Sequence, residues 1–128
     1  MSVAKVISRR DVISLQVSTK LRPRLNLHAT FDDPVQKMIV VIRAGEELPP
    51  HANSRELTQV ILEGTADMII YDEAGKETER FQVDRHTNFC YTLPPGTYHT
   101  KRVYSERIVF FEVMAGPYVP GDVVQLHS

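Results

Sequence analysis

The chain has 128 residues, of which 42% are hydrophobic and 24% are charged, and its formal net charge is −1. This length fits one domain with a single core, and the near-zero charge excludes a global attraction to nucleic acid or to an anionic membrane. No apolar run approaches the roughly 18–20 residues of a membrane span, and Met1–Arg10 lacks the apolar core of a signal peptide. The single cysteine cannot form an internal disulfide. We therefore expect a cytoplasmic protein.

The first predicted element, over residues 8–20 (SRRDVISLQVSTK), is a short helix or an extended segment. Ser8 with Asp11 three residues later is typical of a helix N-terminus. Four apolar residues would form one face of that helix, namely Val12, Ile13, Leu15 and Val17. Because β-branched residues dominate this face, a strand is equally compatible with it. We assign residues 1–20 to a segment that precedes the main domain, residues 21–121 to that domain and residues 122–128 to a C-terminal tail.

The next stretch, LRPRLNLHA, alternates between polar and apolar residues. If it is extended, as Pro23 favours for the residue before it, one face carries polar side chains and the opposite face carries leucines. The polar face consists of Arg22, Arg24, Asn26 and His28, and the apolar face of Leu21, Leu25 and Leu27. An ordinary edge strand would show this pattern, and so would a binding wall for a carboxylate or phosphate, since arginine presents a planar fork of donors.

The remainder of the chain predicts short strands separated by turns. Runs rich in β-branched and aromatic residues occupy 35–42, 57–62, 66–72, 80–83, 88–93, 99–104 and 108–114. Their close spacing predicts an all-β sandwich or barrel, and Ala74-Gly75 fits the turn of a hairpin. We expect Cys90 to be a buried, inert thiol, and His86 and His127 to be surface residues.

Two segments carry histidines in a recognisable arrangement. In the first, Gly45 is followed by His51-Ala52-Asn53, and in the second, Pro95-Gly96 is followed by His99. These resemble the two motifs of the cupin superfamily, which implies a small jelly-roll β-barrel. In cupins the first motif supplies two histidines and a glutamate, and the second supplies one histidine. Residues two apart on a strand share a face, so they can bind one ion together.

The resemblance extends to the WbuC family of cupin-fold proteins, which is associated with bacterial surface-polysaccharide (O-antigen) biosynthesis genes. It covers residues 20–121 and is carried by the runs RPRLNLHATFDDPVQKMIVVIRAGEELPPH, LPPGTYHT and FFEVMAGPYVPGD. The resemblance implies that the polar strand is functional and that the ligand is a sugar or sugar nucleotide. The candidate ligand-binding residues are Arg22, Arg24, Asn26, His28, His51 and His99.

The sequence departs from the family pattern at the metal ligands. Asn53 stands where a second histidine is usual, and Leu57 stands where a glutamate is usual. Strand alternation turns the neighbouring Glu56 away from the side that Leu57 faces unless a bulge intervenes, so replacement of the missing ligands by Glu56 or His28 stays open. An amide oxygen suits Zn²⁺, Ni²⁺ or Cu²⁺ less well than imidazole does. We therefore expect His51, Asn53 and His99 to bind a divalent transition metal (Zn, Ni, Fe or Mn) weakly or not at all.

Three functional classes remain open, because one fold hosts many functions. The first is a small-molecule binding protein or enzyme with an anionic sugar ligand in the barrel mouth. The second is a metal-dependent isomerase or dioxygenase. The third is a non-catalytic interaction or regulatory module, which a barrel mouth filled by Tyr91, Tyr98 or Phe111 would favour. A homodimer is expected, because a partner would cover the open sheet edges.

Overall fold

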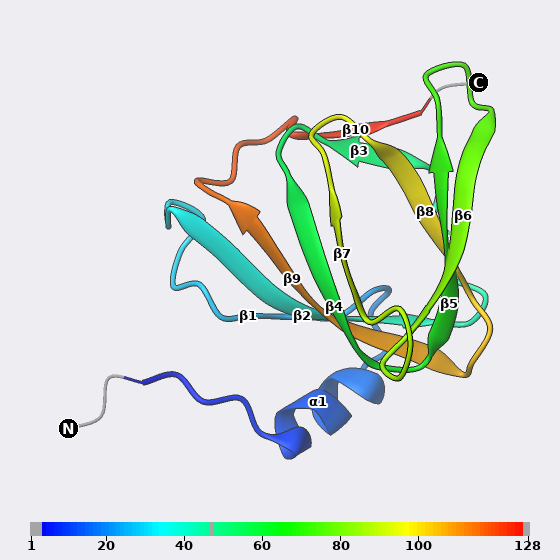
Figure 1. The fold of residues 1–128 in the computed structure, drawn as a ribbon. Helices are drawn as coiled ribbons and strands as arrows, with labels where there is room; N and C mark the ends of the chain where they lie inside the picture. Colours follow the sequence, from blue (N-terminus) through cyan, green and yellow to red (C-terminus); the bar gives the residue numbers. More distant parts are fainter. Residues whose placement is uncertain (1–3, 47, 127–128) are drawn as a thin grey trace.

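The computed structural model describes residues 4–46 and 48–126, and in this part of the chain it shows two packed antiparallel sheets and one short helix (Figure 1). The two sheets have the strand orders β1-β2-β9-β4-β7 and β10-β3-β8-β5-β6. Their arrangement confirms the predicted all-β jelly-roll barrel. The elements are α1 Arg9–Gln16, β1 Arg24–Asn26, β2 Val35–Arg43, β3 His51–Asn53, β4 Leu57–Glu63, β5 Thr65–Tyr71, β6 Glu77–Asp84, β7 Cys90–Leu93, β8 Tyr98–Val103, β9 Arg107–Ala115 and β10 Val123–Gln125.

The main core lies between the two sheets. It contains Met38, Ile61, Met68, Ile108 and Phe110, all at most 6% exposed. Alternation in the strands produces this core, since residues two apart share a face of the sheet. β2 is buried on both faces because its inner side chains join the core and its outer side chains lie under the N-terminal segment.

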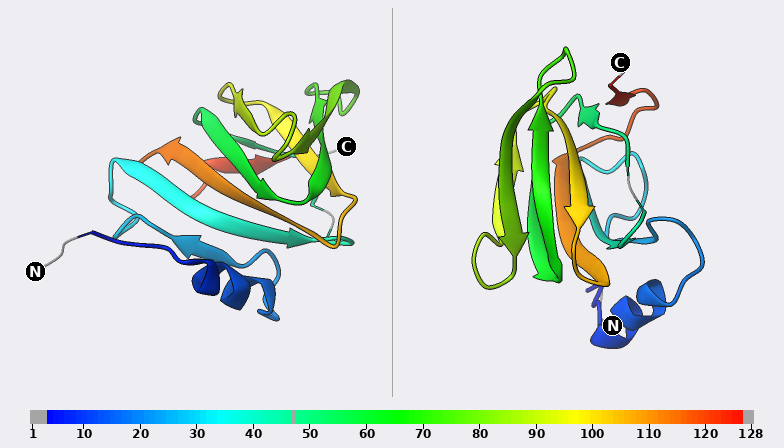
Figure 2. Two further views of the ribbon diagram at one scale, coloured as in Figure 1. Left: turned by 60° about the horizontal axis from the view of Figure 1, so that its bottom comes forward. Right: turned by 90° about the vertical axis from the view of Figure 1, so that its right-hand side faces the viewer.

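The N-terminal segment packs on the outer face of the first sheet, below it in Figure 1 and beside the strands in Figure 2. Ser8 and Asp11 form the predicted reciprocal cap at the start of α1. The helix is shorter than predicted, and only Val12 and Leu15 of its expected apolar face pack on the sheet, whereas Ile13 is half exposed. Within the residues described, no helix combines the length and apolarity that crossing a bilayer requires.

The predicted polar strand is shorter than its sequence pattern. Arg22 has a φ of 46°, in the left-handed region, so the extended backbone of β1 begins at Arg24 and not at Leu21. Leu21 is accordingly exposed, while Leu25 and Leu27 pack on the outer cluster of Ile39, Val41 and Val109. The predicted alternation is therefore correct for residues 24–28 and wrong at Leu21, which was expected on the apolar face.

Two further expectations need correction. Residues 123–125, assigned to a tail, form β10 and pair with β3 at the edge of the second sheet. Cys90, expected to be buried, is exposed because it starts the edge strand β7. His86 is at the surface as predicted, and His127 lies outside the described residues. The hairpin between β5 and β6 turns at Gly75, whose φ is 85°.

Candidate functional site

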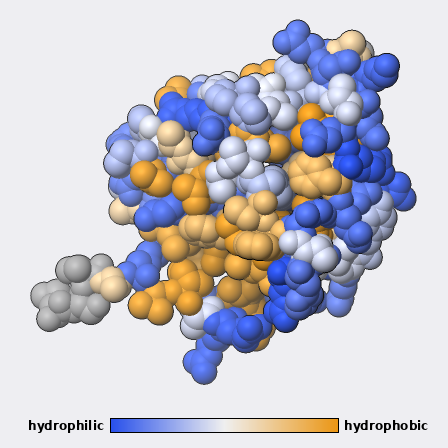
Figure 3. Space-filling model, viewed as in Figure 1, coloured by the Kyte–Doolittle hydropathy of each residue, from blue (hydrophilic) through white to orange (hydrophobic). Residues whose placement is uncertain are grey.

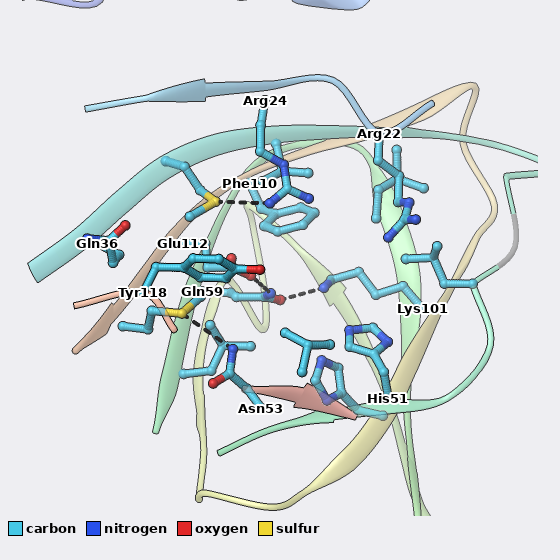
Figure 4. Close-up of a pocket in the computed structure, with 18 of the residues that line it drawn as sticks. Arg22, Arg24, Gln36, His51, Asn53, Gln59, Lys101, Phe110, Glu112 and Tyr118 are labelled. Carbon is cyan, nitrogen blue, oxygen red and sulfur yellow. Dashed lines mark hydrogen bonds between the residues drawn. The ribbon is translucent and has the colours of Figure 1, made fainter. Parts of the chain in front are cut away.

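A cavity of about 520 Å³ opens at the mouth of the barrel between the two sheets (Figure 4). Its size is that of ordinary small-molecule pockets. The structure brings all six sequence-derived candidates to its wall, namely Arg22, Arg24, Asn26, His28, His51 and His99. Phe110 and Met114 belong to the apolar part of the same wall, which is the combination of apolar surface and a few polar groups that ligand sites show.

Two arginines stand at the mouth of the cavity. Figure 4 shows the side chains of Arg22 and Arg24 directed inward from the β1 side. The Arg24 guanidinium contacts the Met38 sulfur at 3.7 Å, and among the residues that the structure describes neither arginine forms an ion pair. The nearby Glu46 carboxylate accepts from the Arg22 backbone N–H but is paired with Arg43 at 2.8 Å. Both guanidinium groups therefore remain available to an anion.

His28 and Asn26 leave two buried polar atoms without partners. His28 Nδ1 lies 3.1 Å from the Lys37 backbone N–H and 3.0 Å from the Lys37 carbonyl oxygen, so Nδ1 has a partner in either tautomer, unlike Nε2. Among the described residues, this Nε2 and Asn26 Oδ1 have no hydrogen-bond partner. Unpartnered buried polar atoms cost stability, so this end of the cavity is not optimised for folding alone.

His51 and His99 face each other across β3 and β8. They are directly paired in the strand register, and their ring centroids are 4.5 Å apart. Nδ1 of each ring lies near a backbone carbonyl, that of Pro49 at 3.2 Å and that of Thr97 at 2.9 Å. A carbonyl only accepts, so each Nδ1 donates and each Nε2 keeps its lone pair. Burial lowers the pKa of both imidazoles, that of His99 to about 3, so both rings are neutral at pH 7.

The structure places the remaining candidate metal ligands as follows. Asn53 is buried in the cavity wall, but its amide donates to the Met114 sulfur at 3.4 Å and accepts from the Arg55 N–H at 3.1 Å. Leu57 also lines the cavity, while Glu56 is exposed and does not replace it. In residues 4–46 and 48–126, no group of three or more His, Cys, Asp or Glu side chains is placed to hold a metal ion. Weak metal binding remains a prediction.

The sequence analysis missed a polar chain on the cavity floor. Lys101 donates from Nζ to Oε1 of Gln59, and Gln59 donates from Nε2 to Glu112 at 2.6 Å. The Tyr91 hydroxyl donates to the same Gln59 oxygen. The signal was a long polar residue inside each of two largely apolar strands, Gln59 in LTQVIL and Glu112 in IVFFEVM. Lys101, two residues after His99, shares that residue's face of β8.

Lys101 is nearly buried, and its ammonium group is held by a hydrogen bond and a cation–π contact. Its side chain is 7% exposed, and Nζ lies 4.1 Å from the centroid of the Phe110 ring. Burial lowers the pKa of Lys101 to about 8, against which the Glu112 charge acts to raise it. Glu112 is the one acidic residue among the described residues of the cavity wall, which also carries two arginines and this lysine. The cavity therefore has an excess of positive charge.

Aromatic residues do not fill the barrel mouth. Tyr91 packs edge-on against Phe81, with centroids 5.6 Å apart, and Phe111 packs on the outer cluster with the N-terminal segment. Neither they nor Tyr98 line the cavity in the described part of the chain. Phe31 and Tyr118 contact each other at the wall, and both are exposed at 60% and 45%. The mouth is open, as a binding function requires.

The pKa of His99 predicts a loss of stability in acid. The unfolded chain takes up a proton near pH 6.5, whereas the folded chain takes it up only near pH 3. Between these values the unfolded state binds more protons, so the free energy of unfolding falls as the pH falls. We expect a loss of about 2 kcal/mol between pH 6.5 and pH 5. Urea denaturation of wild type and His99→Gln at both pH values measures it, and an equal pH dependence in the two proteins would contradict the assignment.

Solved structures with a similar fold belong to the cupin superfamily. The capsular polysaccharide assembling protein CapF from Staphylococcus aureus is 13% identical with a TM-score of 0.72, over 87% of this chain and 33% of its own. An oxalate decarboxylase from Bacillus subtilis is 17% identical with a TM-score of 0.64, over 81% of this chain and 27% of its own. Procruciferin, an 11S globulin from Brassica napus, is 16% identical with a TM-score of 0.67, over 85% of this chain and 28% of its own.

These similarities establish the fold and no more, because the identities are low. The chain spans about a third of the length of each of these proteins or less. No curated protein matches its sequence significantly. A family model does match, over residues 13–83, which run from the second half of α1 into β6 and include β1 with part of the polar wall and β3 with His51. The chain is therefore a cupin-fold protein that belongs to the family described as Domain of unknown function (DUF6016).

Proposed function

We propose that the protein binds a small anionic carbohydrate, such as a sugar acid, sugar phosphate or sugar nucleotide, in the barrel mouth. One observation carries this proposal: Arg22 and Arg24 project into the cavity, and in the described structure neither has a carboxylate partner. Lys101 adds a third positive charge, and Glu112 supplies the opposing one. An anion would gain charge-assisted hydrogen bonds from the planar guanidinium groups.

The two neutral imidazoles support a hydroxylated ligand. Nε2 of His51 and Nε2 of His99 retain lone pairs, because each Nδ1 donates to a backbone carbonyl. Each Nε2 accepts a hydrogen bond from a sugar hydroxyl without first losing a proton. Such a ligand would make its polar contacts to imidazoles and guanidiniums, and no metal bridge is required.

A role in surface-polysaccharide biosynthesis is the biological setting that we propose for this binding. The WbuC-type motifs from Arg22 to Gly121 favour it. CapF, one of the fold neighbours, is described as assembling capsular polysaccharide. Both observations are similarities to other proteins, so the ligand of this protein has to be identified by binding measurements.

The test is a thermal-shift and calorimetric screen of chelated protein, because a ligand that binds only the native state raises its apparent stability. The panel contains galacturonate, glucose 1-phosphate and UDP-glucose, with uncharged glucose as the reference. We expect an anionic member to raise Tm and glucose to leave it unchanged. Equal shifts with glucose, or no shift with any anionic member, would contradict the proposal.

Arginine variants assign the binding to the cavity. Arg22→Gln and Arg24→Gln are each expected to weaken the anionic ligand about tenfold, the value of one charge-assisted hydrogen bond. Arg9→Gln is the matched control, since Arg9 is exposed at the start of α1 and outside the cavity. Isothermal titration calorimetry measures the three affinities. Equal weakening by Arg9→Gln would show that only net charge matters.

We also propose that the protein is a homodimer. Apolar side chains remain exposed on β4 of the first sheet and in the turn before β7, among them Leu62 at 40% and Phe89 at 52%. Figure 3 shows continuous apolar surface beside α1. A symmetric partner would cover such surface. Sedimentation velocity at micromolar concentration is expected to give the dimer mass, and a monomer would contradict this expectation.

A further inference from the structure

Two aromatic side chains are exposed at the rim of the cavity. Phe31 and Tyr118 both line it, and they are 60% and 45% exposed. Their ring centroids are 5.3 Å apart and their planes are tilted by 46°, so the rings are not stacked flat and apolar surface of each remains open. Figure 4 shows the Tyr118 ring at the cavity on the side away from Arg22. Exposed aromatic surface beside a binding cavity is suited to holding a flat ring.

The backbone beneath this aromatic pair is held in place. Gln36, which is 2% exposed, donates from Nε2 to the carbonyl oxygens of Phe31 at 3.3 Å and of Asp33 at 3.0 Å. The Tyr118 N–H donates to the Phe31 carbonyl oxygen at 2.7 Å, which joins the two loops. These loops also meet at Gly116, where a Cβ would lie 1.9 Å from the Asp33 carbonyl oxygen. A ligand would therefore bind the aromatic pair without first having to order the loops.

The aromatic pair and the arginines lie at different ends of the polar wall. Arg24 is at the start of β1, and the wall continues along the chain to His28. Four residue steps of extended chain span roughly 13 Å. The His28 ring lies near that of Phe31, with centroids 6.1 Å apart. A ligand that reaches both ends therefore needs an acidic group and a flat ring with a spacer between them, which is the layout of a nucleotide.

We propose that the ligand is a nucleotide sugar whose base packs on the aromatic pair and whose phosphates bind Arg22 and Arg24. The inference rests on the proposed function for the anionic part of the ligand, and it selects the nucleotide among the anionic carbohydrates. Aromatic side chains contact the flat face that every base has, so this subsite accepts a base without choosing one. The paired imidazoles of β3 and β8 then remain for the hydroxyls of the attached sugar.

Matched ligands measure the contribution of the base. UMP and ribose 5-phosphate share a phosphorylated ribose and differ in the base that UMP carries, while AMP offers a larger base and uridine has a base without a phosphate. Calorimetric titration of the chelated protein gives the four affinities. We expect UMP or AMP to bind at least about tenfold more tightly than ribose 5-phosphate, because that is the effect of stacking one base on an aromatic side chain.

Aromatic variants assign the base to the rim. Phe31→Ala and Tyr118→Ala should each weaken the tighter nucleotide about tenfold and leave ribose 5-phosphate unchanged. Tyr118→Phe should keep the nucleotide affinity, because it keeps the ring. Phe89→Ala is the matched control, since Phe89 is 52% exposed and outside the cavity.

The outcomes separate this inference from the proposed function. If ribose 5-phosphate binds as tightly as both nucleotides, the anion site stands and the base subsite is overturned. If ribose 5-phosphate does not bind but uridine does, and Tyr118→Ala weakens uridine, the proposed function fails and the base subsite stands. Binding of none of the four ligands would overturn both. An equal loss of nucleotide affinity in Phe89→Ala would show that the aromatic pair does not hold the base.

Discussion

Replacing Asn53 with His and Leu57 with Glu is expected to raise the affinity for Zn²⁺ or Ni²⁺ by at least about two orders of magnitude. His51 and His99 already face each other with centroids 4.5 Å apart. Residue 53 shares the face of His51 on β3, and residue 57 is 4% exposed at the cavity wall. The two changes would complete a set of three imidazoles and one carboxylate, which balances the charge of a divalent ion.

The controls for this repaired site use the same background. His51→Ala or His99→Ala should remove the gained affinity, because each deletes one imidazole. Asn53→His with Thr58→Glu is the matched control, since alternation along β4 turns residue 58 away from the side that Leu57 faces. Calorimetric titration measures the affinities, and elemental analysis measures the wild type. Stoichiometric metal that survives purification of the wild type would contradict the expectation of weak binding.

Gly64→Ala is expected to destabilise the protein by about 3–5 kcal/mol, or to prevent folding. A Cβ at residue 64 would lie 2.1 Å from the Arg107 carbonyl oxygen and 2.9 Å from the Ile108 Cα, which are backbone atoms of β9. That strand pairs with both β2 and β4, so it cannot move without opening the first sheet. The positive φ of 92° at residue 64 adds the ordinary strain of a side chain in the left-handed region.

Gly45→Ala separates the two causes of that loss. Gly45 has nearly the same φ, 88°, but a Cβ there would meet nothing within 4 Å. This variant should cost only about 1 kcal/mol, because it carries the backbone strain without the collision. Urea denaturation gives the free energy of unfolding for both variants. Losses of equal size would show that the close approach of β9 to residue 64 is not what requires glycine there.

The sequence analysis predicted the strands and the polar wall because both follow from the alternation of neighbouring residues. Alternation in LRPRLNLHA assigns Arg24 and Asn26 to one face whatever the rest of the chain does. The same reasoning failed at Leu21, which is exposed because a left-handed backbone at Arg22 interrupts the run, although Arg22 itself lines the cavity as predicted. It also failed for β10, a strand of three residues whose only signal is its pairing with β3.

The polar chain on the cavity floor could not be predicted from the sequence, for a different reason. Lys101, Gln59 and Glu112 lie on three strands and belong to both sheets. Each strand reveals which of its residues share a face, but contact between faces depends on the packing of one sheet on the other. The two histidines were found because a motif resemblance supplied the missing long-range information for His51 and His99.

The C-terminal strand β10 offers a position for a fluorescent label that reports occupancy of the cavity. Val123 and Gln125 line the cavity wall and the intervening Val124 does not, although Val123 and Val124 are equally exposed at 48%. A polarity-sensitive dye attached at Val124→Cys would therefore sit on the outside of a strand whose other side contacts the ligand space. Cys90 is exposed and would have to be changed to Ser first. Such a labelled protein would convert occupancy into a fluorescence change, allowing compound libraries and cell extracts to be screened before any ligand is known.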